Sequence, residues 1–142
     1  MRTVGIHSPT TPIMLWSGRI LSALAVAFLL FDASIKLIPL AVVTDTMVQL
    51  GYSGGADLAR GLGVLTLVCV ALYMYPSTSV LGAILLTGLF GGAMASHLRV
   101  ASPIFSHLLF GAYLGVMVWG GLYFRDARLR ALLPWRRPDK QG

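Results

Sequence analysis

Long apolar stretches occupy four parts of the chain, over about residues 13–37, 57–75, 79–97 and 104–124. The hydrocarbon core of a bilayer is about 30 Å thick, so a spanning helix needs about 20 mostly apolar residues. Each stretch meets that length. The pattern predicts an all-α integral membrane four-helix bundle, folded as a single membrane domain over residues 1–142 and ending in a basic tail at 125–142.

Proline-containing breaks separate the later stretches. Pro76 closes the second stretch, and Pro103 stands directly before the fourth, where proline suits the first turn of a helix. The connections over residues 76–78 and 98–103 are short, and short links force neighbouring helices to lie antiparallel. Four antiparallel spans place both termini on the same side of the membrane.

The link between the first and second spans is longer. Within Leu40–Leu50, the apolar residues Val43, Met47 and Leu50 recur at helical spacing. The segment is too short to span a bilayer, so we expect a short amphipathic helix in the first outer loop, lying on the rim of the bundle. Such a helix serves either as a spacer or as a lid.

Composition supports a membrane protein. The 142 residues are 56% hydrophobic and 11% charged, with a mean hydropathy of +0.79, whereas an average soluble domain is about 45–50% apolar and about 25% charged. A soluble domain of this size is mostly surface, and eleven Lys and Arg with five Asp cannot cover it. A disordered chain and an ordinary cytosolic enzyme are therefore excluded.

The net charge of +6 is concentrated at the two ends of the chain. From Arg125 onward there are six basic and two acidic residues, and Arg2 and Arg19 lie near the start. Basic residues concentrate in cytoplasmic segments, so we expect both termini in the cytoplasm and a multi-pass protein of the inner (plasma) membrane. The charge is a topology signal rather than a folded basic surface, so the expected partner is the lipid bilayer and not nucleic acid.

Cys69 is the single cysteine and lies inside an apolar stretch. No disulfide within the chain and no CxxC pair is available, which argues against a thiol-relay oxidoreductase. We interpret Cys69 as a small buried apolar residue.

Polar and ionisable residues gather where the predicted spans meet the outer side of the membrane, although such groups are costly inside a bilayer. They are Asp32, Ser34, Lys36, Arg60, His97, Arg99 and His107. Asp32 and Lys36 are four residues apart and can pair on one helix face. A nine-residue turn between His97 and His107 can bring both imidazoles together.

If these ends converge, they form a pocket with one carboxylate, three cations and two imidazoles. His97, His107 and Asp32 are then the candidate catalytic residues, and the candidate cofactor-binding residues are Lys36, Arg60, Arg99 and Ser34. Such a pocket favours an anionic or carbonyl-bearing ligand, with histidine as the proton carrier. The alternative is that the long cations are interfacial anchors that reach to water.

Metal and haem binding are not favoured. Histidine pairs with a carboxylate can ligate zinc or iron, but the chain has no HExxH or comparable spacing. We therefore expect no metal site.

Glycine spacing predicts close helix contacts. Gly88 and Gly92 form one GxxxG motif, and Gly111 and Gly115 form another, on the third and fourth spans. Small residues at this spacing let helices approach closely in lipid. We expect these motifs to pack the two spans together, and a homo-oligomer stays open as the alternative.

The sequence resembles the DoxX-like family of small four-helix membrane proteins over roughly Trp16–Pro134. The stretch Leu81–Arg99 is the most specific part, because its glycines occur together with a His-x-Arg motif. The other matching segments are Phe31–Leu37, Leu50–Ser53, Leu72–Pro76 and Trp119–Arg125. The resemblance implies the fold and a membrane location; members are similar to a small subunit associated with thiosulfate:quinone oxidoreductase and to partners in membrane oxidoreductase complexes.

Three functions follow as hypotheses. The first is a redox-accessory membrane subunit with an outward-facing quinone or small-molecule site and a membrane oxidoreductase as its partner. The second is a non-catalytic scaffold or partner subunit. The third is a small membrane isomerase that moves a proton between a histidine and a carboxylate on a lipophilic substrate.

Overall fold

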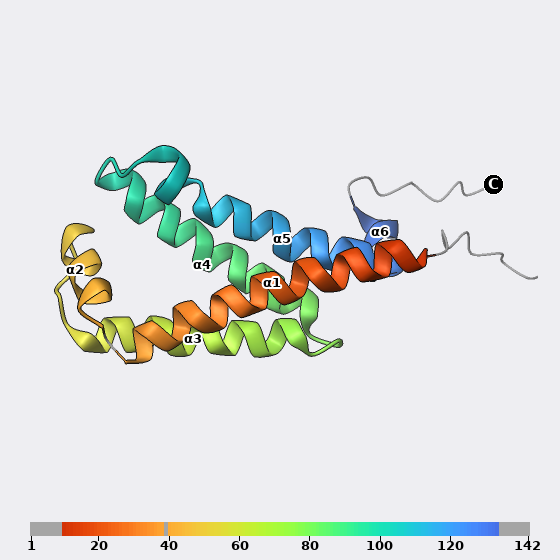
Figure 1. Cartoon of the computed structure of the whole chain (residues 1–142), viewed down its shortest axis with the longest axis horizontal. Helices are drawn as coiled ribbons and strands as arrows, with labels where there is room; N and C mark the ends of the chain where they lie inside the picture. The colour runs from red at the N-terminus through yellow and green to blue at the C-terminus, as the bar shows by residue number, and fades with distance from the viewer. Residues whose placement is uncertain (1–9, 39, 134–142) are drawn as a thin grey trace, which may run out of the picture.

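The computed structural model describes residues 10–38 and 40–133, and in these ranges the regular structure is entirely helical. In chain order the elements are α1 (Pro12–Leu37), α2 (Ala41–Gln49), α3 (Ala56–Met74), α4 (Ser79–Arg99), the π-helical turn η1 (Ile104–Leu108), α5 (Phe110–Arg125) and α6 (Ala127–Leu132) (Figure 1).

Four helical segments are long and apolar enough to cross a membrane: α1, α3, α4 and the segment Ile104–Arg125 that joins η1 to α5. The predicted all-α membrane bundle and its four spans are confirmed, with boundaries that differ by one or two residues. The short helix predicted between the first and second spans is present as α2. The helix α6 was not predicted, and residues 134–142 of the basic tail lie outside the described residues.

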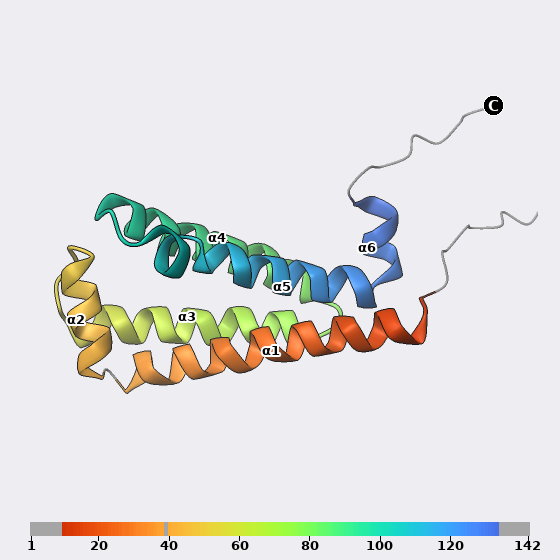
Figure 2. The same cartoon turned by 45° about the horizontal axis from the view of Figure 1, so that its top comes forward.

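The four long helices form a bundle in which α1 contacts α3 and α5, and α4 contacts the same two helices. The helices α1 and α4 therefore lie on opposite corners (Figure 2). All four long helices contribute buried side chains to the core, among them Leu29, Tyr73, Leu86 and Leu122.

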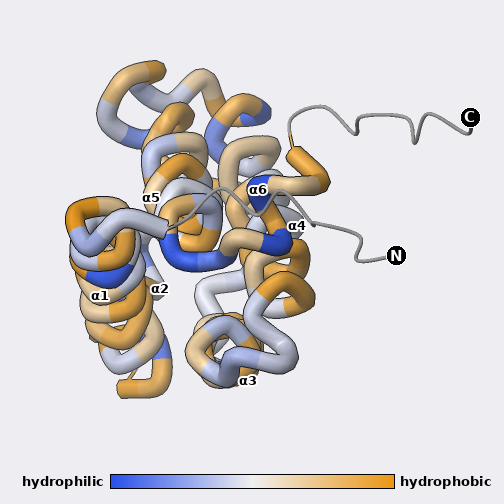
Figure 3. The backbone as a smooth tube through the Cα atoms, turned by 90° about the vertical axis from the view of Figure 1, so that its right-hand side faces the viewer, coloured by the Kyte–Doolittle hydropathy of each residue, from blue (hydrophilic) through white to orange (hydrophobic). Residues whose placement is uncertain are grey.

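Large apolar side chains also cover the outside of the bundle. Ile13, Phe105 and Val116 are 78%, 78% and 72% exposed, and Figure 3 shows hydrophobic positions on every side of the long helices. Apolar surface on all sides of a helix is typical of a chain surrounded by lipid, since water does not reach it there. The protein is a multi-pass membrane protein.

The two ends of the bundle differ, and we name them by what they carry. The loop end carries α2 and the turn η1, whereas the terminal end carries Thr10 and α6 (Figure 1). At the loop end α2 buries Val43 and Met47 against Ala59 of α3, so the apolar face predicted from the sequence holds it on the bundle.

The closest helix contacts occur at Gly82 and Gly121, which do not belong to the predicted GxxxG motifs. A Cβ atom placed on Gly82 would lie 2.3 Å from the backbone nitrogen of Tyr73, and one on Gly121 would lie 2.3 Å from Oγ of Ser22. These contacts join α3 to α4 and α1 to α5. They allow the backbones to approach more closely than any larger residue permits.

The predicted packing of the GxxxG motifs is wrong for Gly88, Gly92 and Gly115, where an added Cβ would meet nothing within 4 Å. Only Gly111 makes a close contact, with Met94 of α4. Spacing shows which residues share a helix face, but it does not show which face turns inward. The face of α4 that turns inward carries Ala83, Leu86 and Phe90, which are buried.

Candidate functional site

The acid–base pair predicted on α1 is formed. Nζ of Lys36 lies 2.5 Å from Oδ2 of Asp32, and both side chains are about three-quarters buried. Ser34, on the same turn, donates its hydroxyl hydrogen to the Leu30 carbonyl at 2.7 Å and is therefore engaged within its own helix. Lys36 compensates the charge of Asp32, which lowers the free-energy cost of an ionised carboxylate near the end of a span.

The two histidines lie together at the loop end, as the turn between them predicts. The ring centroids of His97 and His107 are 5.6 Å apart, with an angle of 59° between the rings. Nδ1 of His97 is 3.1 Å from the Ser102 hydroxyl, and Nδ1 of His107 is 2.8 Å from the Ser106 hydroxyl. Within the described residues, neither Nε2 has a hydrogen-bond partner, and neither is a buried atom.

Local backbone geometry brings the rings together. After α4 the chain reverses at Ala101, which adopts the left-handed conformation at φ +52°, an uncommon one for residues other than glycine. Pro103 directly precedes η1. The Pro103 carbonyl accepts hydrogen bonds from the backbone nitrogens of His107 and Leu108 at 3.1 and 3.2 Å. Single π-helical turns are frequent at functional sites, and this one sets the direction of His107.

Arg99 holds the loop between α2 and α3. Its guanidinium donates to the Leu50 carbonyl and lies 5.6 Å from the ring of Tyr52. The Tyr52 hydroxyl is 2.7 Å from the Ser96 hydroxyl, so the loop is bound to the end of α4 twice. Gly51, at φ +79°, permits the turn on which these contacts depend.

Arg60 lies at the start of α3, 3.7 Å from the carboxylate of Asp57. Both side chains are exposed, and exposed pairs of this kind contribute about 0–1 kcal/mol. Within residues 10–38 and 40–133, no hydrogen bond or ion pair joins Asp32, Lys36 or Arg60 to either histidine. The predicted site residues therefore form separate groups at one end of the bundle.

In the described part of the chain, no three side chains of His, Cys, Asp or Glu lie together in an arrangement that would hold a metal ion. Cys69 is buried, as its apolar neighbours predict.

A polar cluster inside the bundle was missed by the sequence analysis. The buried Tyr73 hydroxyl donates to the Val118 carbonyl at 2.9 Å and is 2.8 Å from the hydroxyl of Ser22. The guanidinium of Arg125 lies 5.0 Å from the Tyr73 ring. The signal was the presence of Ser22 and Tyr73 within apolar spans, because a buried hydroxyl requires a partner.

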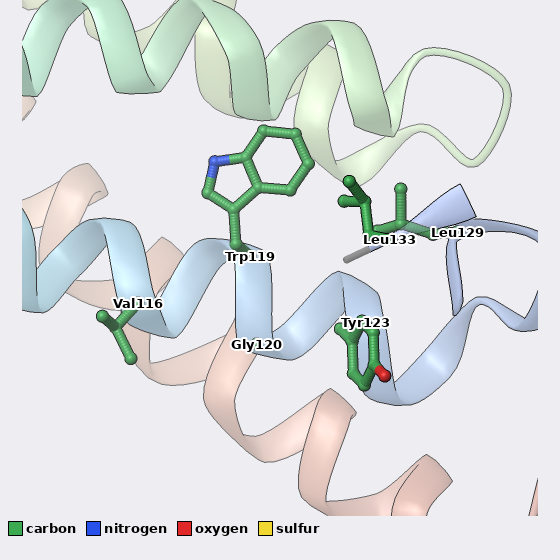
Figure 4. A pocket seen from close by; sticks show the side chains of 6 residues that line it. All are labelled: Val116, Trp119, Gly120, Tyr123, Leu129 and Leu133. Carbon is green, nitrogen blue, oxygen red and sulfur yellow. The ribbon is translucent and has the colours of Figure 1, made fainter. Parts of the chain in front are cut away.

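A groove of about 340 Å³ lies beside α6 (Figure 4), at the end of the bundle opposite the turn η1 (Figure 1). Residues from α5 and from the segment containing α6 line it: Val116, Trp119, Gly120, Tyr123, Leu129 and Leu133. The groove is almost wholly apolar, so it is not suited to proton transfer.

The model of the DoxX-like family matches residues 20–121, which are well over half of the chain and include both histidines and Arg99. No curated protein and no solved structure matches. With its four spans and this match, the chain belongs to the DoxX-like family.

Proposed function

We propose that this DoxX-like membrane protein is an accessory subunit of a membrane oxidoreductase and binds a quinone, or a similar carbonyl-bearing small molecule, at its loop end. The observation that carries the proposal is the histidine pair. His97 and His107 lie 5.6 Å apart, serines engage both Nδ1 atoms, and both Nε2 atoms are left for a ligand.

The chemistry of the pair suits a quinone. A neutral imidazole whose Nδ1 accepts a hydrogen bond carries its proton on Nε2 and can donate it to a quinone carbonyl oxygen. Reduction of a quinone to a quinol takes up two electrons and two protons; the partner oxidoreductase would supply the electrons, and histidine is the side chain suited to relay protons near neutral pH.

The charged residues would act around the pair rather than in it. Arg99 holds the α2–α3 loop against α4, so in this proposal α2 covers the rim beside the ligand. Asp32, Lys36, Ser34 and Arg60 would contribute to the field at the loop end and would not touch the ligand in the arrangement described. Catalytic and cofactor-binding roles for these residues remain predictions.

The proposal includes an orientation of the protein in the membrane. Arg19, Arg125, Arg128 and Arg130 lie at or near the terminal end of the described residues, against Asp126. The positive-inside rule would place this end in the cytoplasm and the histidine pair on the outer face of the inner (plasma) membrane.

Replacing His97 or His107 with alanine is expected to weaken quinone binding by roughly three- to tenfold, since one hydrogen bond contributes about 0.5–1.5 kcal/mol. The measurement is equilibrium dialysis of the full-length protein in detergent against a short-chain ubiquinone, with the retained quinone quantified by its ultraviolet absorbance. The third histidine of the sequence, His7, lies outside the described residues and has no role in the proposal, so His7→Ala is the matched control and should bind like the unaltered protein. Absence of binding, or equal affinity in all variants, would contradict the proposal.

A second candidate function, a scaffold subunit without its own chemistry, is favoured by the outer face of α4. Gly88, Gly91 and Gly92 are exposed there, and an added Cβ on any of them meets nothing within 4 Å. Such a face admits a helix of another subunit at close range.

Gly92→Leu is expected to abolish recovery of a tightly associated membrane subunit if this face is the interface. Proteins that co-purify with the tagged chain under mild detergent would be compared for Gly92→Leu and for Gly61→Leu, an equally open glycine on α3. Equal recovery from both variants would count against the scaffold face. The third hypothesis, an isomerase, has less support because Asp32 is paired with Lys36 and contacts neither imidazole.

A further inference from the structure

The groove at the terminal end has an apolar lining with one side open. Trp119 and Tyr123 of α5 form one part of it, and Leu129 and Leu133 form another (Figure 4). The polar atom of Trp119 is already engaged, because its indole N–H donates to the Thr87 hydroxyl at 2.9 Å. The groove therefore offers a ligand mainly apolar surface.

The groove lies where the chain leaves the bundle. Asp126 breaks the helix between α5 and α6, and its carboxylate accepts hydrogen bonds from the backbone nitrogens of Arg128 and Leu129, which start α6. Leu129 is buried, while Leu132 and Leu133 remain 56% and 42% exposed. Because α6 directly follows a spanning helix, it lies at the depth of the lipid headgroups.

Positive charge surrounds the same corner. Arg125, Arg128 and Arg130 stand against one acid, Asp126. Arg130 is occupied structurally: it donates to the carbonyls of Tyr123 and Phe124 and to the hydroxyl of Thr10.

Two of these arginines keep donors without partners in the described chain. Arg128 is exposed, and its guanidinium makes no hydrogen bond or ion pair within residues 10–38 and 40–133. Arg125 keeps one buried guanidinium nitrogen without a hydrogen-bond partner, and no carboxylate compensates its charge in the described part of the chain. Among the described residues, this corner therefore carries a net positive charge, since Asp126 is its one acid against three arginines.

We propose that the groove between α5 and α6 binds an anionic phospholipid of the adjacent leaflet. An acyl chain lies against Trp119, Tyr123 and Leu133, and the phosphate lies beside Arg128. The apolar lining of the groove favours a hydrocarbon chain, and the neighbouring arginines favour a negative charge. An anionic phospholipid has both. Basic residues at a membrane surface attract such lipids by about 1 kcal/mol each.

The test measures lipid retention by the full-length protein. The protein is reconstituted in nanodiscs of phosphatidylglycerol and phosphatidylcholine in equal parts, released into mild detergent and analysed by native mass spectrometry. We expect bound phosphatidylglycerol to exceed bound phosphatidylcholine several-fold. Arg128→Gln should lower that ratio about fivefold, whereas Arg60→Gln, an exposed arginine at the opposite end, should leave it unchanged.

A pair of neighbouring leucines tests the groove itself. Leu133→Glu places a carboxylate in the groove and should remove the retained lipid, whereas Leu132→Glu adds the same charge at a more exposed position that does not line the groove. Equal retention by these two variants would overturn the proposal. Equal binding of the two phospholipids by the unaltered protein would overturn it as well, and this is the result expected if another segment of the chain or a protein partner fills the groove.

Discussion

Gly82→Ala is expected to destabilise the bundle by about 3 kcal/mol or more, the upper end of what overpacking costs. A Cβ atom at this position would lie 2.3 Å from the backbone nitrogen of Tyr73 and 2.6 Å from its Cα. The atoms in conflict belong to the backbone, so no side-chain rotation relieves them and α3 must move away from α4. The measurement is unfolding of the detergent-solubilised protein by increasing fractions of sodium dodecyl sulfate, followed by circular dichroism.

Gly88→Ala is the matched control, since it makes the same change in the same helix. An added Cβ there meets nothing within 4 Å, and alanine favours the helix over glycine by roughly 0.5–1 kcal/mol. The control should therefore be as stable as the unaltered protein or slightly more stable. Equal stability of the two variants would show that α3 and α4 are not in contact at Gly82.

Tyr73→Phe is expected to cost about 1–3 kcal/mol of stability. The substitution keeps the ring and removes the hydroxyl, which is buried, donates to the Val118 carbonyl at 2.9 Å and is 2.8 Å from the hydroxyl of Ser22. Ser22 then remains buried without this partner, and a buried polar group that loses its hydrogen bond destabilises the fold. The same denaturant titration measures the effect.

Tyr75→Phe removes an equivalent hydroxyl two residues away, on a side chain that is 63% exposed. It should change stability by less than about 0.5 kcal/mol. The double variant Ser22→Ala, Tyr73→Phe should cost less than the sum of the two single changes, because residues joined by a hydrogen bond are not additive. Strict additivity would be evidence against the contact between α1 and α3.

Much of the fold follows from the sequence because a bilayer imposes a length on each spanning helix. The apolar stretches, Pro76 and Pro103 were sufficient to predict the four spans, and Val43 and Met47 were sufficient to predict α2. The π-helical turn η1 was not predicted, because its hydrogen bonds to Pro103 depend on how the chain reverses after α4. The helix α6 was also missed, since a short basic segment carries little hydrophobic periodicity.

The candidate site was predictable only in part. Pairs close in sequence were found correctly: Asp32 with Lys36 on one helix face, and His97 with His107 across a short turn. Contacts between segments that are distant in the sequence were not predicted, because hydrophobic periodicity does not show which helix faces meet. Arg99 was grouped with the histidines, yet its contacts are with Leu50 and Tyr52.

The proposed function requires that the imidazoles of His97 and His107 hydrogen-bond the carbonyl oxygens of a bound quinone. The most direct measurement is the infrared difference spectrum of a short-chain quinone carrying ¹³C at its carbonyl carbons, bound to the full-length protein in detergent. We expect a carbonyl stretch shifted to lower frequency than in empty micelles, with the shift lost in His97→Ala and His107→Ala. A carbonyl band at the micelle frequency in the unaltered protein would contradict it.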